Sequence, residues 1–224
     1  MSFKIENFSE EFKAEFIRKG GWEQNCPVHI DRLKLVEISH ITFENTLKTG
    51  KLITLDIVAQ NVVEIFKELL TSEFPIESIN LLDQYSFDDY KSMSANNSSC
   101  FNNRLILPKG DRYSIHAYGL AIDLNPLQNP MISYKSESEF FSNFEIYPAE
   151  GKNYINRMII RPGMVEHVVE IFFKNGFDIW GGLWNEPVDY HHFEVNRQLA
   201  DKLAKATKEE AEILWAKHLH KSSA

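Results

Sequence analysis

The segment over residues 114–123, with the sequence SIHAYGLAID, constrains the fold of this chain more than any other feature. Gly119 allows a tight turn after His116. If that turn leads into a strand, alternate side chains point to opposite faces, which places Asp123 on the face opposite Leu120. A histidine presented from the turn can then face a carboxylate that emerges from the strand. The segment therefore predicts a site built on the start of a short strand.

A second segment supplies further polar groups of the same kind. The sequence WGGLW, from Trp180 to Trp184, is followed by Asp189-Tyr-His-His192-Phe. Zinc binds imidazole nitrogen and carboxylate oxygen, and catalytic zinc sites use three protein ligands. His192 is a plausible third ligand, and Asp189, three residues earlier, is placed to act on a water molecule as a base without binding the metal. His191 and His192 point to opposite sides of a strand, so only one of them can be a ligand, and the spacing favours His192.

Each of these residues also has an ordinary structural explanation. A lone histidine is usually a surface or hydrogen-bonded residue, and an Asp-x-x-His spacing carries little information by itself. Trp180 and Trp184 would by default be core residues, with Gly181 and Gly182 forming a turn between them. The spacing alone therefore leaves a metal site and a purely structural role open.

Composition limits the class of protein. The chain has 224 residues, of which 43% are hydrophobic and 25% charged, enough to bury one core. A net charge of −8 argues against a nucleic-acid-binding protein, and no apolar run of the length of a membrane span occurs. No secretory signal is visible at the N-terminus, so we expect a cytoplasmic protein or one released by lysis or by a non-standard route. Cys26 and Cys100 are expected to be unpaired thiols, and two cysteines exclude a cysteine-rich zinc site.

The hydrophobic pattern predicts one α+β domain over residues 1–224, with a motif-bearing core over 101–195 and a preceding part, 1–100, of unrecognised role. Helices are expected over residues 9–19, 57–70 with Asp56 as N-cap, 164–174, and from Asn196, as N-cap, to about 219. Strands are expected over 33–43 and 51–55 with a turn at Thr49-Gly50, and over 76–82, 177–180 and 191–195. Residues 92–103 and 126–153 are interpreted as loops, the second forming one wall of a cleft.

The motifs together resemble the M15 peptidases. These are zinc enzymes that include D-alanyl-D-alanine carboxypeptidases, D-alanyl-D-alanine dipeptidases and the L-alanyl-D-glutamate endopeptidases of phage endolysins. The family pattern Ser-x-His-x-x-Gly-x-Ala-x-Asp, followed by an acidic residue three positions before a histidine, is matched at every fixed position. The resemblance covers about residues 101–195 and is closest to the endolysin-like subgroup. It implies a fold like that of hedgehog domains and D-Ala-D-Ala peptidases, with a small antiparallel sheet that carries zinc and is flanked by helices.

The resemblance also implies a role for each matching residue. The zinc ligands would be His116, Asp123 and His192, the catalytic acid and base Asp189, and the group that stabilises the oxyanion Arg104, which is otherwise an ordinary surface arginine. Ser114, Trp180 and Trp184 would contact the substrate or support the metal ligands. The implied activity is zinc-dependent hydrolysis of peptidoglycan stem peptides, by a D,D-carboxypeptidase or an L-alanyl-D-glutamate endopeptidase.

One alternative is a non-catalytic, zinc-stabilised binding module of the same fold. The presence of both Asp189 and Arg104 favours the enzyme, because a degenerate module would be expected to lose one of them. No separate wall-binding module of the kind found in many endolysins is recognisable.

Overall fold

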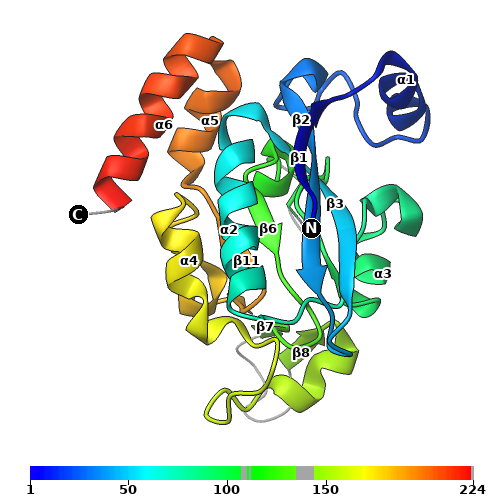
Figure 1. Ribbon diagram of the computed structural model, residues 1–224, viewed down its shortest axis with the longest axis vertical. Coiled ribbons are helices and arrows are strands. Elements are labelled where there is room, and N and C mark those ends of the chain that lie inside the picture. Colours follow the sequence, from blue (N-terminus) through cyan, green and yellow to red (C-terminus); the bar gives the residue numbers. More distant parts are fainter. Residues whose placement is uncertain (107–109, 111, 135–143, 223–224) are drawn as a thin grey trace.

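The computed structural model describes residues 1–106, 110, 112–134 and 144–222, and its fold is α+β, as the sequence predicts. The N-terminal sheet is antiparallel, with the order β1-β2-β3: β1 (Phe3–Asn7), β2 (Leu33–Ile41) and β3 (Leu47–Leu55). Helix α2 (Ala59–Thr71) packs on β2 (Figure 1). Its apolar side recurs every three to four residues, and Val62, Ile65, Phe66 and Leu69 are all buried.

The predicted turn at Thr49-Gly50 is wrong. Both residues lie inside β3 and pair with β2, and the chain reverses around Asn45, which has a positive φ of 57°. Gly50 is needed for a different reason. A Cβ atom there would meet the carbonyl oxygen of Ile79 at 2.2 Å, so this glycine allows a neighbouring strand to approach closely.

Asp56 is not a helix N-cap, contrary to the prediction. It begins a 3-10 turn, Asp56–Val58, that leads into α2, and no side chain caps that turn. Its carboxylate instead accepts two hydrogen bonds from the guanidinium of Arg32, at 2.6 and 2.9 Å. The carboxylate therefore bonds to a side chain 24 residues earlier in the sequence and not to the backbone of the following helix. By contrast, Ser9, the first residue of the helix expected over 9–19, caps helix α1 (Glu10–Arg18): its side chain accepts a hydrogen bond from the N–H of Phe12.

Residues 76–103 contain more regular structure than predicted. The expected strand over 76–82 is reduced to β4 (Ser78–Ile79), and the 3-10 turn Leu82–Tyr85 follows it. The expected loop over 92–103 holds the end of α3 (Asp89–Ser94) and β5 (Asn97–Ser98), which pairs with β4 in parallel. The chain beyond β5 lies between the N-terminal sheet and the site. The N–H of Phe101 donates to the carbonyl of Ile53, and Ser99 forms an isolated antiparallel β-bridge with Asp123.

A second antiparallel sheet has the order β6-β11-β9, from β6 (Ala121–Asp123), β11 (His192–Glu194) and β9 (Ile179–Trp180). A third has the order β10-β7-β8, from β10 (Val188–Asp189), β7 (Met131–Tyr134) and β8 (Phe144–Tyr147). The loop predicted over 126–153 is therefore partly a pair of strands, followed by the 3-10 turn Ala149–Tyr154. Residues 135–143 of that predicted loop lie outside the described part of the chain.

The remaining helices are α4 (Val169–Lys174), α5 (Arg197–Lys205) and α6 (Lys208–Ser222). The predicted helix over 164–174 begins as a separate 3-10 turn, Val165–His167. The predicted C-terminal helix is two helices, because α5 ends at Ala206, whose backbone is extended; Asn196 caps α5 as expected. In the view of Figure 1, these helices lie to the left of the N-terminal sheet, and α1 and α3 lie to the right.

Buried apolar side chains from Phe8 to Trp215 form one cluster, which includes residues of the N-terminal sheet, α2, β6 and β11. Two of the strands that bear the candidate site are therefore backed by the same core as the first hundred residues. Within the described residues, no helix is both long and apolar enough to cross a membrane.

Candidate metal centre

His116 is presented from a short 3-10 turn, Ile115–Tyr118. Ser114 caps this turn, and its hydroxyl accepts a hydrogen bond from the backbone N–H of His116 at 3.3 Å. Gly119 ends the turn with a φ of 66°, a left-handed conformation that suits glycine. The chain then enters β6, as the sequence predicts. Ser114 therefore shapes the turn that carries His116.

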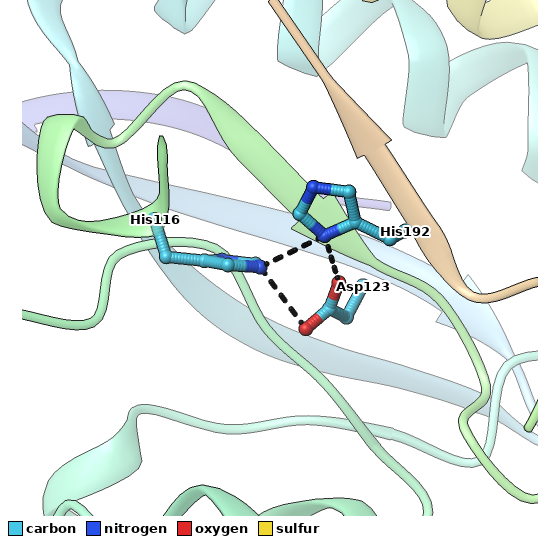
Figure 2. A group of neighbouring side chains, drawn as sticks. All are labelled: His116, Asp123 and His192. Carbon is cyan, nitrogen blue, oxygen red and sulfur yellow. Dashed lines mark hydrogen bonds and ion pairs between the residues drawn. The ribbon is translucent and has the colours of Figure 1, made fainter. Parts of the chain in front are cut away.

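Asp123 and His192 lie directly opposite each other on β6 and β11. His192 Nδ1 is 2.9 Å from Asp123 Oδ1, and His116 Nε2 is 3.1 Å from Asp123 Oδ2. The same two ring nitrogens lie 3.2 Å apart. Figure 2 shows both rings turned toward the one carboxylate. All three residues are buried, so the tertiary structure brings together the three side chains that the motifs single out.

The outer nitrogen of each ring has its own partner. His116 Nδ1 faces the backbone carbonyl of Cys100, which can only accept a hydrogen bond, so this nitrogen carries the proton. His192 Nε2 lies 3.0 Å from a carboxylate oxygen of Glu194 and donates to it. In the neutral form of each ring, the lone pair therefore points inward toward Asp123. Such outer partners commonly orient histidines that bind metals.

The close approach of these charged and polar groups shifts the pKa values of Asp123 and His192. Burial alone would raise the pKa of Asp123, but the charges and hydrogen bonds of the neighbouring histidines outweigh it and hold the pKa well below its usual value. Burial alone would lower the pKa of His192, but hydrogen bonds to Asp123 and Glu194 raise it to about 10. The metal-free group thus holds a proton on His192 at neutral pH.

The donor set fits a divalent cation. Two inward lone pairs and a carboxylate converge, with all their donor atoms within 4.8 Å of one another. These electron-rich atoms repel one another unless a positive charge lies among them. Two imidazole nitrogens and one carboxylate oxygen are ligands that zinc accepts, and three protein ligands leave a coordination position free.

Asp189 lies beside this group, at the end of β10. It is 7% exposed, and burial raises the pKa of its carboxyl group although His191 and His192 oppose the effect. Its Oδ1 lies 3.0 Å from His191 Nε2 but outside hydrogen-bonding geometry, so this oxygen has no hydrogen-bond partner among the described residues. A buried carboxyl oxygen without a partner is suited to receive a proton.

Arg104 does not point into the group of ligands as a free cation. Its guanidinium pairs with Asp89 of α3 at 3.0 Å, and its side chain is 36% exposed. The backbone is close to the site, since the carbonyl of Arg104 accepts a hydrogen bond from the N–H of Ser114. The structure therefore places this residue beside the His116 turn and pairs it with an acidic partner that the sequence does not indicate.

The two tryptophans differ in their surroundings. The ring of Trp184 lies 5.3 Å from that of His192, centroid to centroid, and is partly exposed. Trp180 stacks on Phe193 at 6.2 Å, and its Nε1 donates to the carbonyl of Tyr190 at 2.9 Å. Trp184 is thus the one that contacts a candidate ligand, and Trp180 supports the chain between Asp189 and His192.

Sequence reasoning missed Glu194 and Asn129. Glu194 lies two residues after His192, and the two-residue period of a strand would have placed both side chains on one face. Asn129 carries the carbonyl to which His191 Nδ1 donates at 2.8 Å, and no local pattern signals that contact. His191 lies in the turn before β11 and not on the strand as predicted, and its other ring nitrogen, Nε2, lies 3.0 Å from Asp189 Oδ1.

Comparisons with known proteins agree with the motifs. Residues 108–195 match a family model described as D-alanyl-D-alanine carboxypeptidase, and that match spans His116, Asp123, Asp189 and His192. Searches of curated proteins and of solved structures found no match.

Proposed function

Because the chain belongs to the M15 family of peptidases, we propose that it hydrolyses peptide bonds in peptidoglycan stem peptides, with a zinc ion held by His116, Asp123 and His192. The observation that carries the proposal is the convergence of these three side chains at 2.9 to 3.2 Å, with the outer ring nitrogens already engaged. Zinc in such a site supplies Lewis-acid chemistry, which polarises a carbonyl group and makes water a better nucleophile.

Asp189 is the proposed acid and base. Its Oδ1 would take a proton from the attacking water and return it to the amine that leaves. A carboxyl group whose pKa is raised by burial holds that proton more readily than an exposed one. Oδ1 makes no hydrogen bond to a described residue, although His191 Nε2 lies 3.0 Å from it, so accepting a proton there breaks no hydrogen bond.

Arg104 and Trp184 are proposed to act on the substrate. Arg104 would stabilise negative charge on the carbonyl oxygen, which requires its guanidinium to turn from Asp89 toward the substrate. Trp184, partly exposed beside His192, would contact the peptide next to the scissile bond.

The test is mass spectrometry of defined muropeptides incubated with the zinc-loaded protein, before and after chelation. We expect a chelator to abolish cleavage and added zinc to restore it. Loss of a terminal D-alanine identifies a carboxypeptidase, and a cut between L-alanine and D-glutamate identifies an endopeptidase. If the protein holds zinc but leaves every muropeptide intact, the peptidase proposal fails and a zinc-stabilised binding module takes its place.

Two variants separate the roles. Asp189→Asn keeps the size of the side chain but removes the proton acceptor, so turnover should fall about 100-fold or more while zinc stays bound. His116→Ala should lose both zinc and turnover. The matched control is His29→Ala, because the side chain of His29 is 68% exposed and belongs to no candidate ligand group. A fully active His116→Ala protein would exclude the proposed site.

A further inference from the structure

The turn Tyr190-His191 decides how Asp189 lies relative to His192. Asp189 ends β10, which belongs to the β10-β7-β8 sheet, whereas His192 begins β11, in the β6-β11-β9 sheet. Two residues therefore connect the proposed base to a proposed ligand across two different sheets. A small movement of this turn changes the distance between base and ligand directly.

The turn is held from both sides. Trp180 Nε1 donates to the carbonyl of Tyr190, on the side of β9. On the other side, the buried ring of His191 donates through Nδ1 to the backbone carbonyl of Asn129 at 2.8 Å. The ring of Tyr190 lies against the guanidinium of Arg157, whose central carbon is 4.4 Å from the ring centroid.

Arg157 connects these contacts. All five of its N–H groups are engaged, and its side chain is only 12% exposed. Its Nε and Nη2 donate to the two carboxylate oxygens of Glu166, at 2.5 and 2.7 Å. Nη2 also donates to the side-chain oxygen of Asn129 at 2.9 Å, and Nη1 donates to the carbonyls of Gln128 and Tyr154.

The planar guanidinium thus donates to the side-chain oxygen of Asn129, whose backbone carbonyl holds His191, and covers the ring of Tyr190. Lysine cannot replace it, because an ammonium group has neither the fixed fork of five donors nor a flat face. We infer that Arg157 is a positioning residue that clamps the Tyr190-His191 turn and so sets Asp189 against the proposed metal ligands. This inference rests on the proposed function for its effect on catalysis, but the clamp itself is testable without it.

The experiment compares Arg157→Lys with Arg161→Lys in the full chain. Arg161 lies in the same segment and stacks on Tyr154 at 4.0 Å, outside the Tyr190-His191 turn, so it is the matched control. The first readout is NMR of the protein labelled with ¹⁵N-histidine, in which the buried Nδ1–H of His191 gives a slowly exchanging signal. His191→Gln identifies that signal by its loss. The other readouts are zinc content, kcat and KM on the muropeptide that the wild type cuts.

We expect Arg157→Lys to lose or shift the His191 signal and to lower kcat about 10- to 100-fold, with KM nearly unchanged and one zinc per chain retained. Arg161→Lys should leave all four readouts as in the wild type. An unchanged His191 signal in Arg157→Lys overturns the clamp, as does an equal loss in both variants. If the wild type cuts no muropeptide, the proposed function fails, but the His191 signal still tests the clamp. The two failures can therefore be told apart.

If Arg157→Lys does not fold, Glu166→Gln tests the same clamp more gently. It keeps the size of the side chain but removes the charge, and because an amide has only one acceptor oxygen, one of the two bonds from Arg157 becomes weaker and the other is lost. The same shift of the His191 signal with a smaller loss of kcat supports the inference. A folded Glu166→Gln protein with both readouts unchanged overturns it.

Discussion

Each of the two histidines that face Asp123 has an outer partner of a different kind. His116 donates to a backbone carbonyl, which no side-chain substitution removes, whereas His192 donates to the carboxylate of Glu194. The bond to Glu194 both orients the ring and makes its inner nitrogen more basic. The contribution of an outer partner is therefore measurable only at His192.

Glu194→Gln should weaken zinc binding about 10-fold, because the amide keeps a hydrogen-bond acceptor but loses the charge. Competition with a chromophoric chelator measures the zinc affinity directly. Glu209→Gln is the control, since Glu209 is exposed at the start of α6. Equal zinc affinity in Glu194→Gln and the control would show that the carboxylate has no effect on the metal.

The raised pKa of His192 has a consequence for the pH dependence of stability. The ordinary pKa of histidine is 6.5, and here the hydrogen bonds to Asp123 and Glu194 raise it to about 10, against the effect of burial. In the metal-free protein this stabilisation is fully present below about pH 6.5 and is lost as the pH rises toward 10. Zinc requires the deprotonated ring, so zinc and the proton compete for His192.

The rise in thermal midpoint when zinc is added to the chelated protein should therefore grow between pH 5.5 and pH 8. Displacement of one proton changes the apparent affinity by about tenfold per pH unit. Scanning calorimetry at fixed free zinc measures the rise. The same increment at both pH values would show that no proton leaves the site when zinc binds.

At the scale of elements, the His116 turn depends on Gly119 in two ways. Its φ of 66° is left-handed, and a Cβ atom there would meet the backbone nitrogen of Leu55 at 2.6 Å. The same contact region holds a hydrogen bond, from the N–H of Leu55 to the carbonyl of Gly119 at 3.1 Å. The turn that carries a proposed ligand is thus seated on the end of β3.

Gly119→Ala should destabilise the protein by about 2 kcal/mol or more, because strained φ and a backbone clash act together. Gly20→Ala is the matched control, since Gly20 has a φ of 85° with nothing within 4 Å of a Cβ. The free energies of unfolding of both variants, measured in urea, are compared; the difference between their losses is the cost of the backbone clash. Equal losses would mean that the contact with β3 adds nothing beyond the strained φ.

Several elements differ from their predicted structure because contacts with residues far away in the sequence determine their conformation. Asp56 pairs with Arg32 instead of capping a helix, and Gly50 makes room for Ile79 instead of forming a turn. The polar stretch over 92–103 lacks periodicity because its buried polar side chains bond to other segments. Asn96, for example, donates to Gln128 at 2.9 Å.

At the scale of the whole molecule, the first hundred residues contact the candidate site through β3. The carbonyl of Ile53 accepts from Phe101, and Leu55 donates to Gly119, on either side of the His116 turn. Cys100, whose carbonyl holds His116, belongs to the same apolar cluster as the N-terminal sheet. We propose that residues 1–100 are part of one domain with the motif-bearing part.

A chain of residues 101–224 alone should therefore fail to fold and should bind zinc only weakly. Circular dichroism with heating, and zinc content after gel filtration, measure both. The control is a chain that begins at residue 8, which lacks the largely exposed edge strand β1 and should fold with reduced stability. A cooperative thermal transition in the 101–224 chain would contradict the proposal.

The sequence by itself determined the α+β class, the Asn196 cap and the turn at Gly119 that enters β6, and its resemblance to the M15 peptidases indicated which histidines and carboxylates to consider together. The cap and the turn depend on residues a few positions apart, where the period of a strand and the geometry of a turn operate. Only the tertiary structure decided that Arg104 pairs with Asp89, that the C-terminal helix is two helices, and that Arg157 reaches the Tyr190-His191 turn. Those contacts join segments far apart in the chain, and burial selects them only when the whole core has formed.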